Sequence, residues 1–314
     1  MDSLKSKIDA DIPLTTLFST FLGVETVSNL EASEAEIIVQ GIPADLASSG
    51  RSGSREGPPA VRLASVHVAW EGARWPWDFF VLDELKVEDI GDLQFKTGDP
   101  ASMVERLEAQ TTRILNSGKK MLSFGGDHFI ALPLIRSHAA KYGKVALIHF
   151  DAHTDIYSTE GYHHGTMFYR AVKDGLVDPT RSVQVGIRTS YEKENHPFTV
   201  LDARFVNKHG PEMVATKIKE IVGTGPTYIS FDIDCLDPAF APGTGTPVVG
   251  GLSTDYALEI IRNLVDLDLV GMDLVEVNPP YDHAGITAIA GATIGLEFLN
   301  VLAARKLRKS EPGV

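Results

Sequence analysis

The chain has 314 residues, enough for one large domain or two of average size, and 43% of them are hydrophobic and 23% charged. This composition is typical of a globular protein with a substantial core and excludes a disordered or fibrous chain. The formal charge of -13 argues against nucleic acid as a partner, because phosphate binding needs clustered basic residues, and it favours a cationic ligand.

Nothing in the sequence indicates export or membrane insertion. Residues 1–14 carry charges throughout and lack the apolar run of a signal peptide, and no later segment approaches the apolar length of a membrane helix. The single cysteine, Cys235, allows no internal disulfide, which agrees with a reducing compartment. We therefore expect a cytoplasmic protein with no membrane partner.

Short β-rich runs alternate with amphipathic helical stretches, which predicts an α/β fold with a mostly parallel sheet covered by helices on both faces. Helices are expected from about residue 59 and at 102–117, 130–141, 166–174, 211–222, 254–265 and 287–307. Strands are expected at 36–41, 120–124, 145–150, 182–187, 227–231 and 269–277, several of them apolar throughout. No repeat or linker divides the chain, so we expect a single domain over residues 1–314 with frayed ends at about 1–9 and 309–314.

A loop rich in serine and glycine occupies residues 48–58, before the first predicted helix. A phosphate-cradling loop is one interpretation, but the GKS/T ending and the preceding βα fingerprint are missing. A structural or subunit-contact loop is the interpretation that we prefer.

Acidic and imidazole side chains recur at every second position just past two predicted strands. Asp151, His153 and Asp155 follow the strand at 145–150, and Asp232 and Asp234 follow the strand at 227–231. Positions i and i+2 of an extended segment share one face, so each run projects its side chains together. The carboxyl ends of parallel strands form the edge of the sheet where ligands bind, so the two runs are expected to converge there.

His128 completes this cluster, after Asp127 and two glycines that let the chain turn closely at the end of the strand at 120–124. Four carboxylates and two imidazoles without thiolate suit manganese or a similar divalent ion better than structural zinc. One such aspartate could be a turn former or a helix cap. Burying all of them without cations would cost desolvation and mutual repulsion, so we predict a metal site.

The motifs resemble those of the ureohydrolase family, which includes arginase, agmatinase and guanidino-acid hydrolases. They are GGDH at 125–128, DAHTD at 151–155, HG at 164–165 and SFDIDCLDP at 230–238, with all the expected ligand positions filled in order. The resemblance spans roughly residues 37–304 and implies a three-layer α/β/α fold. It also implies two manganese ions that share a bridging hydroxide and are held by His128, Asp151, His153, Asp155, Asp232 and Asp234, with Asp151 and Asp232 contacting both.

The same resemblance implies catalytic roles. Glu276, within DLVEVNP at 273–279, matches the glutamate that pairs with the substrate guanidinium, and His164 matches the proton-shuttling histidine. Asp155 is expected to orient the hydroxide. The chemistry fits because water is a poor nucleophile at neutral pH unless metal ions lower its pKa. The motif favours His164 over the adjacent His163 as the residue that faces the site.

Three neighbours of these motifs have plainer interpretations. His149 lies on the same strand face as the ligands and is expected to support a ligand or to belong to the core. Cys235 reads as a small buried filler. Asp237, before Pro238, reads as a turn residue.

The substrate is expected to be agmatine, converted to urea and putrescine. Similarity is closer to bacterial agmatinase than to other members, through SGRSG at 49–53, AWE at 69–71, HGTMFY at 164–169 and PGTGTP at 242–247. Agmatine carries two positive charges, in keeping with an acidic protein. An arginase is disfavoured, because Tyr157 stands where arginase has an asparagine and the loop at 156–162 lacks the Ser-Gly-Asn run. The family also implies a homo-oligomer, a trimer or a hexamer.

Three other functions stay open. A guanidinobutyrase or guanidinopropionase would need a polar contact for the substrate carboxylate, which the sequence does not identify. An inactive metal-binding regulator is disfavoured because Glu276 and His164, which serve substrate chemistry, are both present. A deacetylase of related fold would use one zinc ion and fewer acids.

Overall fold

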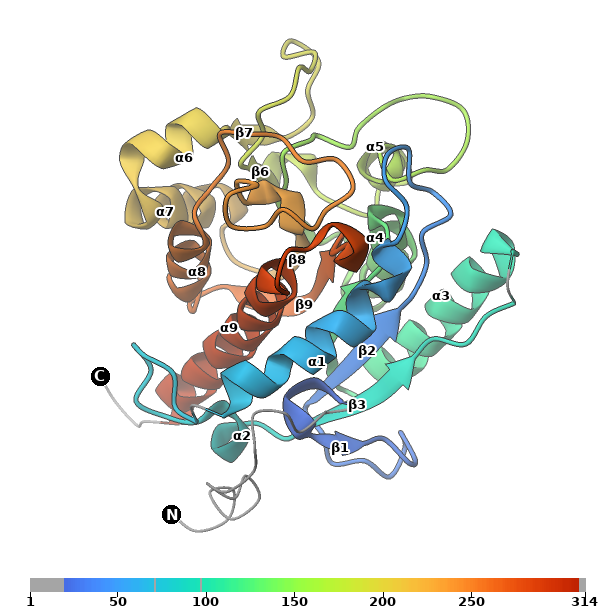
Figure 1. Ribbon diagram of the computed structural model, residues 1–314, viewed down its shortest axis with the longest axis vertical. Coiled ribbons are helices and arrows are strands. Elements are labelled where there is room, and N and C mark those ends of the chain that lie inside the picture. Colours follow the sequence, from blue (N-terminus) through green and yellow to red (C-terminus); the bar gives the residue numbers. More distant parts are fainter. Residues whose placement is uncertain (1–19, 71, 97, 311–314) are drawn as a thin grey trace.

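Nine parallel strands form one sheet in the computed structural model, which describes residues 20–70, 72–96 and 98–310 (Figure 1). The spatial order is β1-β3-β2-β4-β9-β8-β5-β6-β7, and every neighbouring pair is parallel. The strands are β1 (Glu25–Thr26), β2 (Ile37–Ile42), β3 (Val87–Asp92), β4 (Lys120–Gly125), β5 (Ala146–Phe150), β6 (Val183–Val185), β7 (Thr199–Leu201), β8 (Pro226–Asp232) and β9 (Asp268–Val275).

Helices cover both faces of this sheet, which confirms the three-layer α/β/α prediction (Figure 1). One face packs against α1 (Gly57–Ala69), α7 (Pro211–Val222), α8 (Thr254–Arg262) and α9 (Ile286–Ser310). The other packs against α3 (Pro100–Asn116), α4 (Ala131–Tyr142) and α5 (Met167–Lys173). Two short helices, α2 (Val81–Glu84) and α6 (Ala203–His209), complete the described set.

The central strands supply both cores because successive side chains alternate between faces. In β5, Ile148 and Phe150 join the core beneath α7, whereas Leu147 joins the core beneath α4. Both faces are therefore buried, which explains why these strands read as continuous apolar runs.

The predicted strands and helices agree with the structure to within a few residues, but the edge strands β1 and β7, the strand β3 next to β1, and the helices α2 and α6 were missed. Strand β3 reads as an acidic loop in the sequence. Its Asp89 is fully buried because Arg62 of α1 binds it, with Nε 2.8 Å from Oδ2. The other missed elements are short. The expected strand at 269–277 was also too long, since β9 ends at Val275.

Helix α9 corrects the expectation that no segment reaches the apolar length of a membrane helix. It is long and apolar enough to cross a membrane, with a mean hydropathy of 1.7 over its most apolar window, but 89% of that window is buried inside the protein. It packs between α1 and α8 against the sheet (Figure 1). Its all-round apolar surface is that of a core helix.

The frayed ends stay a prediction; residues 309 and 310 form the last positions of α9. Residues 1–9, the stretch considered for a signal peptide and residues 311–314 lie outside the described residues. The assignment of one domain to the whole chain stays a prediction.

Candidate active site

Four adjacent strands at the centre of the sheet bring the site together at their carboxyl ends. In the order β4, β9, β8, β5, they lead to His128, Glu276, Asp232 and Asp151. This edge is where open parallel sheets bind ligands. The predicted convergence of the two alternating runs is therefore what the structure shows.

His128 lies at the centre of a first group of donors. Its Nδ1 atom is 3.2 Å from Asp151 Oδ2, 3.2 Å from Asp155 Oδ2 and 3.3 Å from Asp232 Oδ2, and all four side chains are buried. Nδ1 makes no hydrogen bond of good geometry with any described residue. Such an orphaned buried nitrogen, facing three carboxylates, has the surroundings of a metal ligand.

The opposite side of the His128 ring explains why Nδ1 is free to bind. Nε2 lies 2.8 Å from Ser230 Oγ, and the Ser230 hydroxyl donates to Asp273 Oδ1 at 2.8 Å. Because its one proton is used on Asp273, Ser230 accepts from Nε2–H. The Tyr228 hydroxyl holds the other Asp273 oxygen at 2.8 Å. The neutral, metal-binding form of His128 therefore carries its proton on Nε2 and presents the Nδ1 lone pair to the space between the carboxylates. Burial alone would lower the pKa of His128, but without a metal the three carboxylates raise it well above its ordinary value.

A second group of donors lies beside the first and shares Asp151 with it. His153 Nδ1 is 3.2 Å from Asp151 Oδ1 and 3.1 Å from Asp234 Oδ2. The backbone supports these carboxylates, since Asp232 Oδ1 accepts from the Asp234 N–H and Asp234 Oδ1 accepts from the Ala152 N–H. Asp151 thus presents one oxygen to each group, the arrangement of a ligand that contacts two ions.

The protein alone compensates the charge of Asp151, whose pKa is lowered well below its ordinary value, but not the charges of Asp155, Asp232 and Asp234, whose pKa values are raised. Burial, followed by repulsion from Asp234 and Asp151, holds the pKa of Asp232 well above its ordinary value. Burial and Asp151 raise the pKa of Asp155 to about 7. Burial alone would lower the pKa of His153, but the Asp151 and Asp234 carboxylates raise it to about 12. The cluster calls for more positive charge than two imidazoles supply, and its oxygen and nitrogen donors fit divalent cations.

Glu276 stands directly after β9, at the rim of this cluster. Its Oε1 accepts from the backbone N–H of His128 at 2.9 Å, whereas the buried Oε2 has no hydrogen-bond partner among the described residues. Its φ is +63°, and Asp155 has a φ of +51°. A non-glycine residue in the left-handed region costs about 1–3 kcal/mol, and such strain gathers at functional sites. The strained turn ends the strand and leaves one carboxylate oxygen free for a ligand.

His164 lies against Glu276. Its Nδ1 is 3.2 Å from Glu276 Oε1, and its Nε2 accepts from the Ser49 N–H at 3.0 Å and lies 2.6 Å from Ser49 Oγ. Burial alone would lower the pKa of His164, but the hydrogen bond and the charge of Glu276 raise it. His163 instead bonds Thr159 and the Gly165 N–H, so it does not take part in this contact.

The loop at 48–58 packs over the site through backbone contacts. Asn278 Nδ2 donates to the carbonyls of Arg51 and Ser52, and the Gly53 N–H donates to Asp45. The amide of Ser49 is taken by His164. The protein itself occupies these groups, which agrees with the structural interpretation and not with a phosphate cradle.

Sequence reasoning did not assign roles to Ser49, Gln184, Ser230 and Asp273, which contact the site residues. Gln184, Ser230 and Asp273 are fully buried polar residues in otherwise apolar strands, and that exception to the pattern was the available signal. Ser49 carried no comparable signal, because its contact joins positions 115 residues apart.

The plainer interpretations agree with the geometry. His149 Nε2 lies 2.8 Å from Asp151 Oδ2, so it supports a ligand. Cys235 is buried, which raises the pKa of its thiol well above the ordinary value. Asp237 accepts from the backbone N–H groups of Ala239, Gly250 and Gly251, as a turn residue does.

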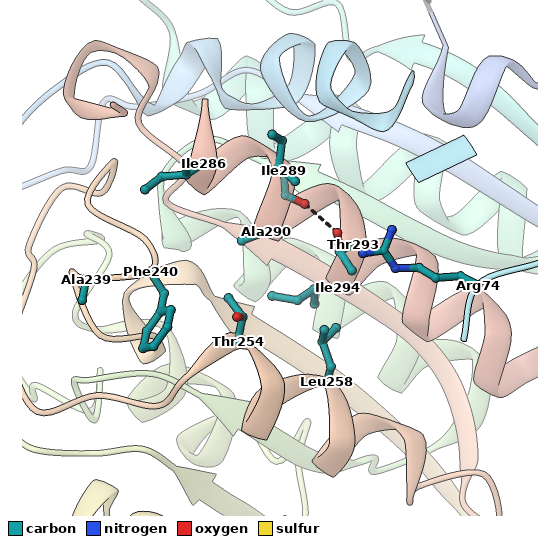
Figure 2. A pocket seen from close by; sticks show the side chains of 10 residues that line it. All are labelled: Arg74, Ala239, Phe240, Thr254, Leu258, Ile286, Ile289, Ala290, Thr293 and Ile294. Carbon is teal, nitrogen blue, oxygen red and sulfur yellow. Dashed lines mark hydrogen bonds between the residues drawn. The ribbon is translucent and has the colours of Figure 1, made fainter. Parts of the chain in front are cut away.

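A separate hollow lies away from this cluster, between α8, α9 and the loop at residues 239–240 (Figure 2). It encloses about 380 Å³ and is lined mainly by apolar side chains such as Phe240, Leu258 and Ile289. None of the predicted site residues lines it.

Comparisons with known proteins agree with this geometry. The model of the Arginase family matches residues 35–300. Relatives named agmatinase include one from Neisseria meningitidis, 59% identical over 87% of this chain and 89% of the relative, and one from Serratia proteamaculans, 56% identical over 88% and 90%. A crystal structure titled as a hypothetical agmatinase from Burkholderia thailandensis superposes with a TM-score of 0.91, at 47% identity over 94% of both chains.

Fold and site define the class as an α/β enzyme with a carboxylate- and histidine-rich metal-binding cluster. The chain belongs to the arginase family and is a ureohydrolase, an enzyme that hydrolyses C–N bonds.

Proposed function

We propose that this ureohydrolase hydrolyses agmatine to urea and putrescine. The observation that carries the proposal is the buried Oε2 atom of Glu276, which has no hydrogen-bond partner among the described residues. Glu276 stands beside the carboxylate cluster and also contacts His164. A planar guanidinium is a cation with paired N–H donors, and a carboxylate is its best complement. The relatives named agmatinase, at 56–59% identity, support agmatine as the guanidine.

The metal centre of this proposal holds two Mn²⁺ ions. His128, Asp151, Asp155 and Asp232 would hold one ion, and Asp151, His153, Asp232 and Asp234 the other, in keeping with the two donor groups around Asp151. Manganese is preferred because the donors are oxygen and imidazole without thiolate. When bound, the ions would lower the pKa of a coordinated water, so that a nucleophile is available at neutral pH.

The protein's own side chains would act on the substrate in turn. Glu276 binds the guanidinium and orients its carbon toward Asp155, whose carboxylate would orient the attacking water. Water adds to the guanidinium carbon, and the C–N bond to the alkylamine breaks. The ring whose Nε2 accepts from Ser49 is the neutral one, and the raised pKa of His164 favours its conversion to the protonated ring, which would deliver a proton to the leaving nitrogen. Ser49 contacts Nε2 on the far side of the His164 ring and so fixes the orientation of the ring.

A substrate panel tests this proposal. Manganese-loaded protein is given agmatine, arginine, 4-guanidinobutyrate or 3-guanidinopropionate, and urea is measured. The highest kcat/KM is expected for agmatine. A preference for a guanidino acid or arginine would reassign the substrate, and urea from none of them would favour the inactive regulator.

Two further properties belong to the proposal. We propose a homo-oligomer, a trimer or hexamer, on the family resemblance, and a location in the cytoplasm, in keeping with the single cysteine of the sequence. Light scattering of the purified protein gives the oligomeric state, and fractionation of cells that express the full chain gives the location. A monomeric mass, or recovery in the exported fraction, would contradict them.

A further inference from the structure

Gln184 on β6 is a fully buried amide, and both of its N–H donors and its carbonyl oxygen have hydrogen-bond partners. Its Nε2 lies 2.7 Å from the carbonyl oxygen of Thr154 and 2.8 Å from His149 Nδ1, and its Oε1 lies 2.7 Å from His196 Nε2. A backbone carbonyl only accepts, so the amide atom that faces Thr154 must be the NH₂ group. This contact fixes the orientation of the whole amide.

The orientation of the amide decides the protonation of His149. Because Gln184 donates to Nδ1, that nitrogen must be the unprotonated one in a neutral ring. Nε2 then carries the proton and donates it to Asp151 Oδ2 at 2.8 Å. A nitrogen that carries a proton cannot bind a cation, so His149 supports Asp151 and is not itself a ligand, although it lies among side chains that could hold an ion.

The same amide also holds the loop that carries three of the proposed ligands. Thr154 lies between His153 and Asp155, and Asp155 has the strained φ of +51°. The bond from Gln184 to the Thr154 carbonyl therefore ties β6 to this loop at the residue before the strained position. The ring of His149 is packed against Phe168 of α5, with centroids 4.3 Å apart, so it has little freedom to turn.

We propose that Gln184 and His149 are positioning residues of the metal centre: through one buried amide they aim the Asp151 carboxylate and hold the Thr154–Asp155 backbone. This inference rests on the metal centre of the proposed function and does not depend on which guanidine is the substrate. Residues that orient metal ligands typically alter metal affinity about 10- to 100-fold when they are removed.

The test measures Mn²⁺ alone, without substrate. Free Mn²⁺ is titrated by EPR against wild type, Gln184→Met, His149→Phe and the double variant. Each single variant is expected to bind ~10- to 100-fold more weakly. Both residues act on Asp151 along one chain of contacts. The loss of Mn²⁺ affinity in the double variant should therefore be smaller than the product of the losses in the two single variants.

His196→Phe is the matched control. It removes the contact to Gln184 Oε1 but leaves both bonds that Nε2 donates, and its Kd for Mn²⁺ should stay within about threefold of wild type. At saturating Mn²⁺, Gln184→Met should lower kcat for agmatine while KM changes less than about twofold, since Gln184 lies behind the ligands. Should Gln184→Met fail to fold, Gln184→Glu keeps the size, removes the donor to Thr154 and should also weaken Mn²⁺ binding.

Unchanged Mn²⁺ affinity in a folded Gln184 variant, or fully multiplicative effects in the double variant, would overturn the positioning role. Wild-type protein that binds Mn²⁺ without hydrolysing agmatine would overturn the substrate proposal only. The two failures are therefore distinguishable.

Discussion

Glu276 and His128 are joined by a hydrogen bond from the backbone N–H of His128 to Glu276 Oε1, at 2.9 Å. One oxygen of the carboxylate thus holds the backbone of a proposed metal ligand, while the other faces no described partner. The side chain proposed to bind the guanidinium is also part of the scaffold of the metal cluster.

Because of this double role, Glu276→Gln tests guanidinium binding more specifically than truncation to alanine does. Glutamine keeps a carbonyl oxygen for the His128 N–H and replaces the free oxygen by an NH₂ group, which repels a guanidinium. We expect kcat/KM for agmatine to fall about 100-fold or more, since hydrogen bonds to charged groups contribute about 1.5–3 kcal/mol each. Mn²⁺ content should stay at the wild-type level by elemental analysis, and Glu276→Ala should lose activity as well. Wild-type kcat/KM in Glu276→Gln would remove this residue from guanidinium binding.

The two adjacent histidines should differ in their effect on turnover. His164→Asn removes the group that contacts Glu276, so kcat is expected to fall about 10²- to 10⁴-fold, the usual contribution of a general acid, with a smaller change in KM. His163→Asn is the control, because that ring bonds only Thr159 and Gly165 among the described contacts. A larger loss in His163→Asn would move the proton-transfer role to the other ring.

Metal binding should stabilise the folded chain because it relieves repulsion among the buried carboxylates. At a Mn²⁺ concentration about 100 times the Kd, the free energy of unfolding should rise by about 2.7 kcal/mol. Chelated wild type should therefore melt at a lower temperature than metal-loaded protein in differential scanning calorimetry. Asp232→Ala and Asp151→Ala should lose the response to Mn²⁺ together with activity; an unchanged response in both would show that they are not ligands.

Gly245 limits the space around the free oxygen of Glu276. A Cβ atom there would lie 3.1 Å from Glu276 Oε2 and 3.4 Å from the Arg51 carbonyl oxygen. Gly245→Ala should therefore crowd the guanidinium position and raise KM for agmatine by about tenfold, the effect of about 1.4 kcal/mol of lost binding. Mn²⁺ affinity serves as the control and should not change. If KM stays at the wild-type value, the substrate does not approach Glu276 from this side.

The His164–Glu276 contact should appear in the pH dependence of stability. The pKa of His164 is raised in the folded protein, so its stabilising contribution is fully present below the unfolded-state pKa of about 6.5 and is lost as pH rises through the folded value. In urea unfolding of metal-free protein, the free energy of unfolding of the wild type should exceed that of His164→Asn by more at about pH 6 than at about pH 9. The opposite trend would mean that the folded state favours the neutral ring.

The sequence by itself determined the core of the sheet and the membership of the metal cluster. Continuous apolar runs such as that of β5 can only be buried on both faces, and acids at positions i and i+2 after a strand must project together. Asp151, His153, Asp232 and Asp234 are therefore placed at one edge of the sheet by the sequence pattern alone. These are consequences of local periodicity.

Only the tertiary structure decided the features that depend on contacts between distant segments. Strand β3 exists with a buried Asp89 because Arg62, from a helix earlier in the chain, neutralises it. The contact of Ser49 with His164 and the orientation of the Gln184 amide likewise depend on partners that no local pattern specifies. Burial makes each such polar group require a partner, but which partner it meets is settled by how the layers pack.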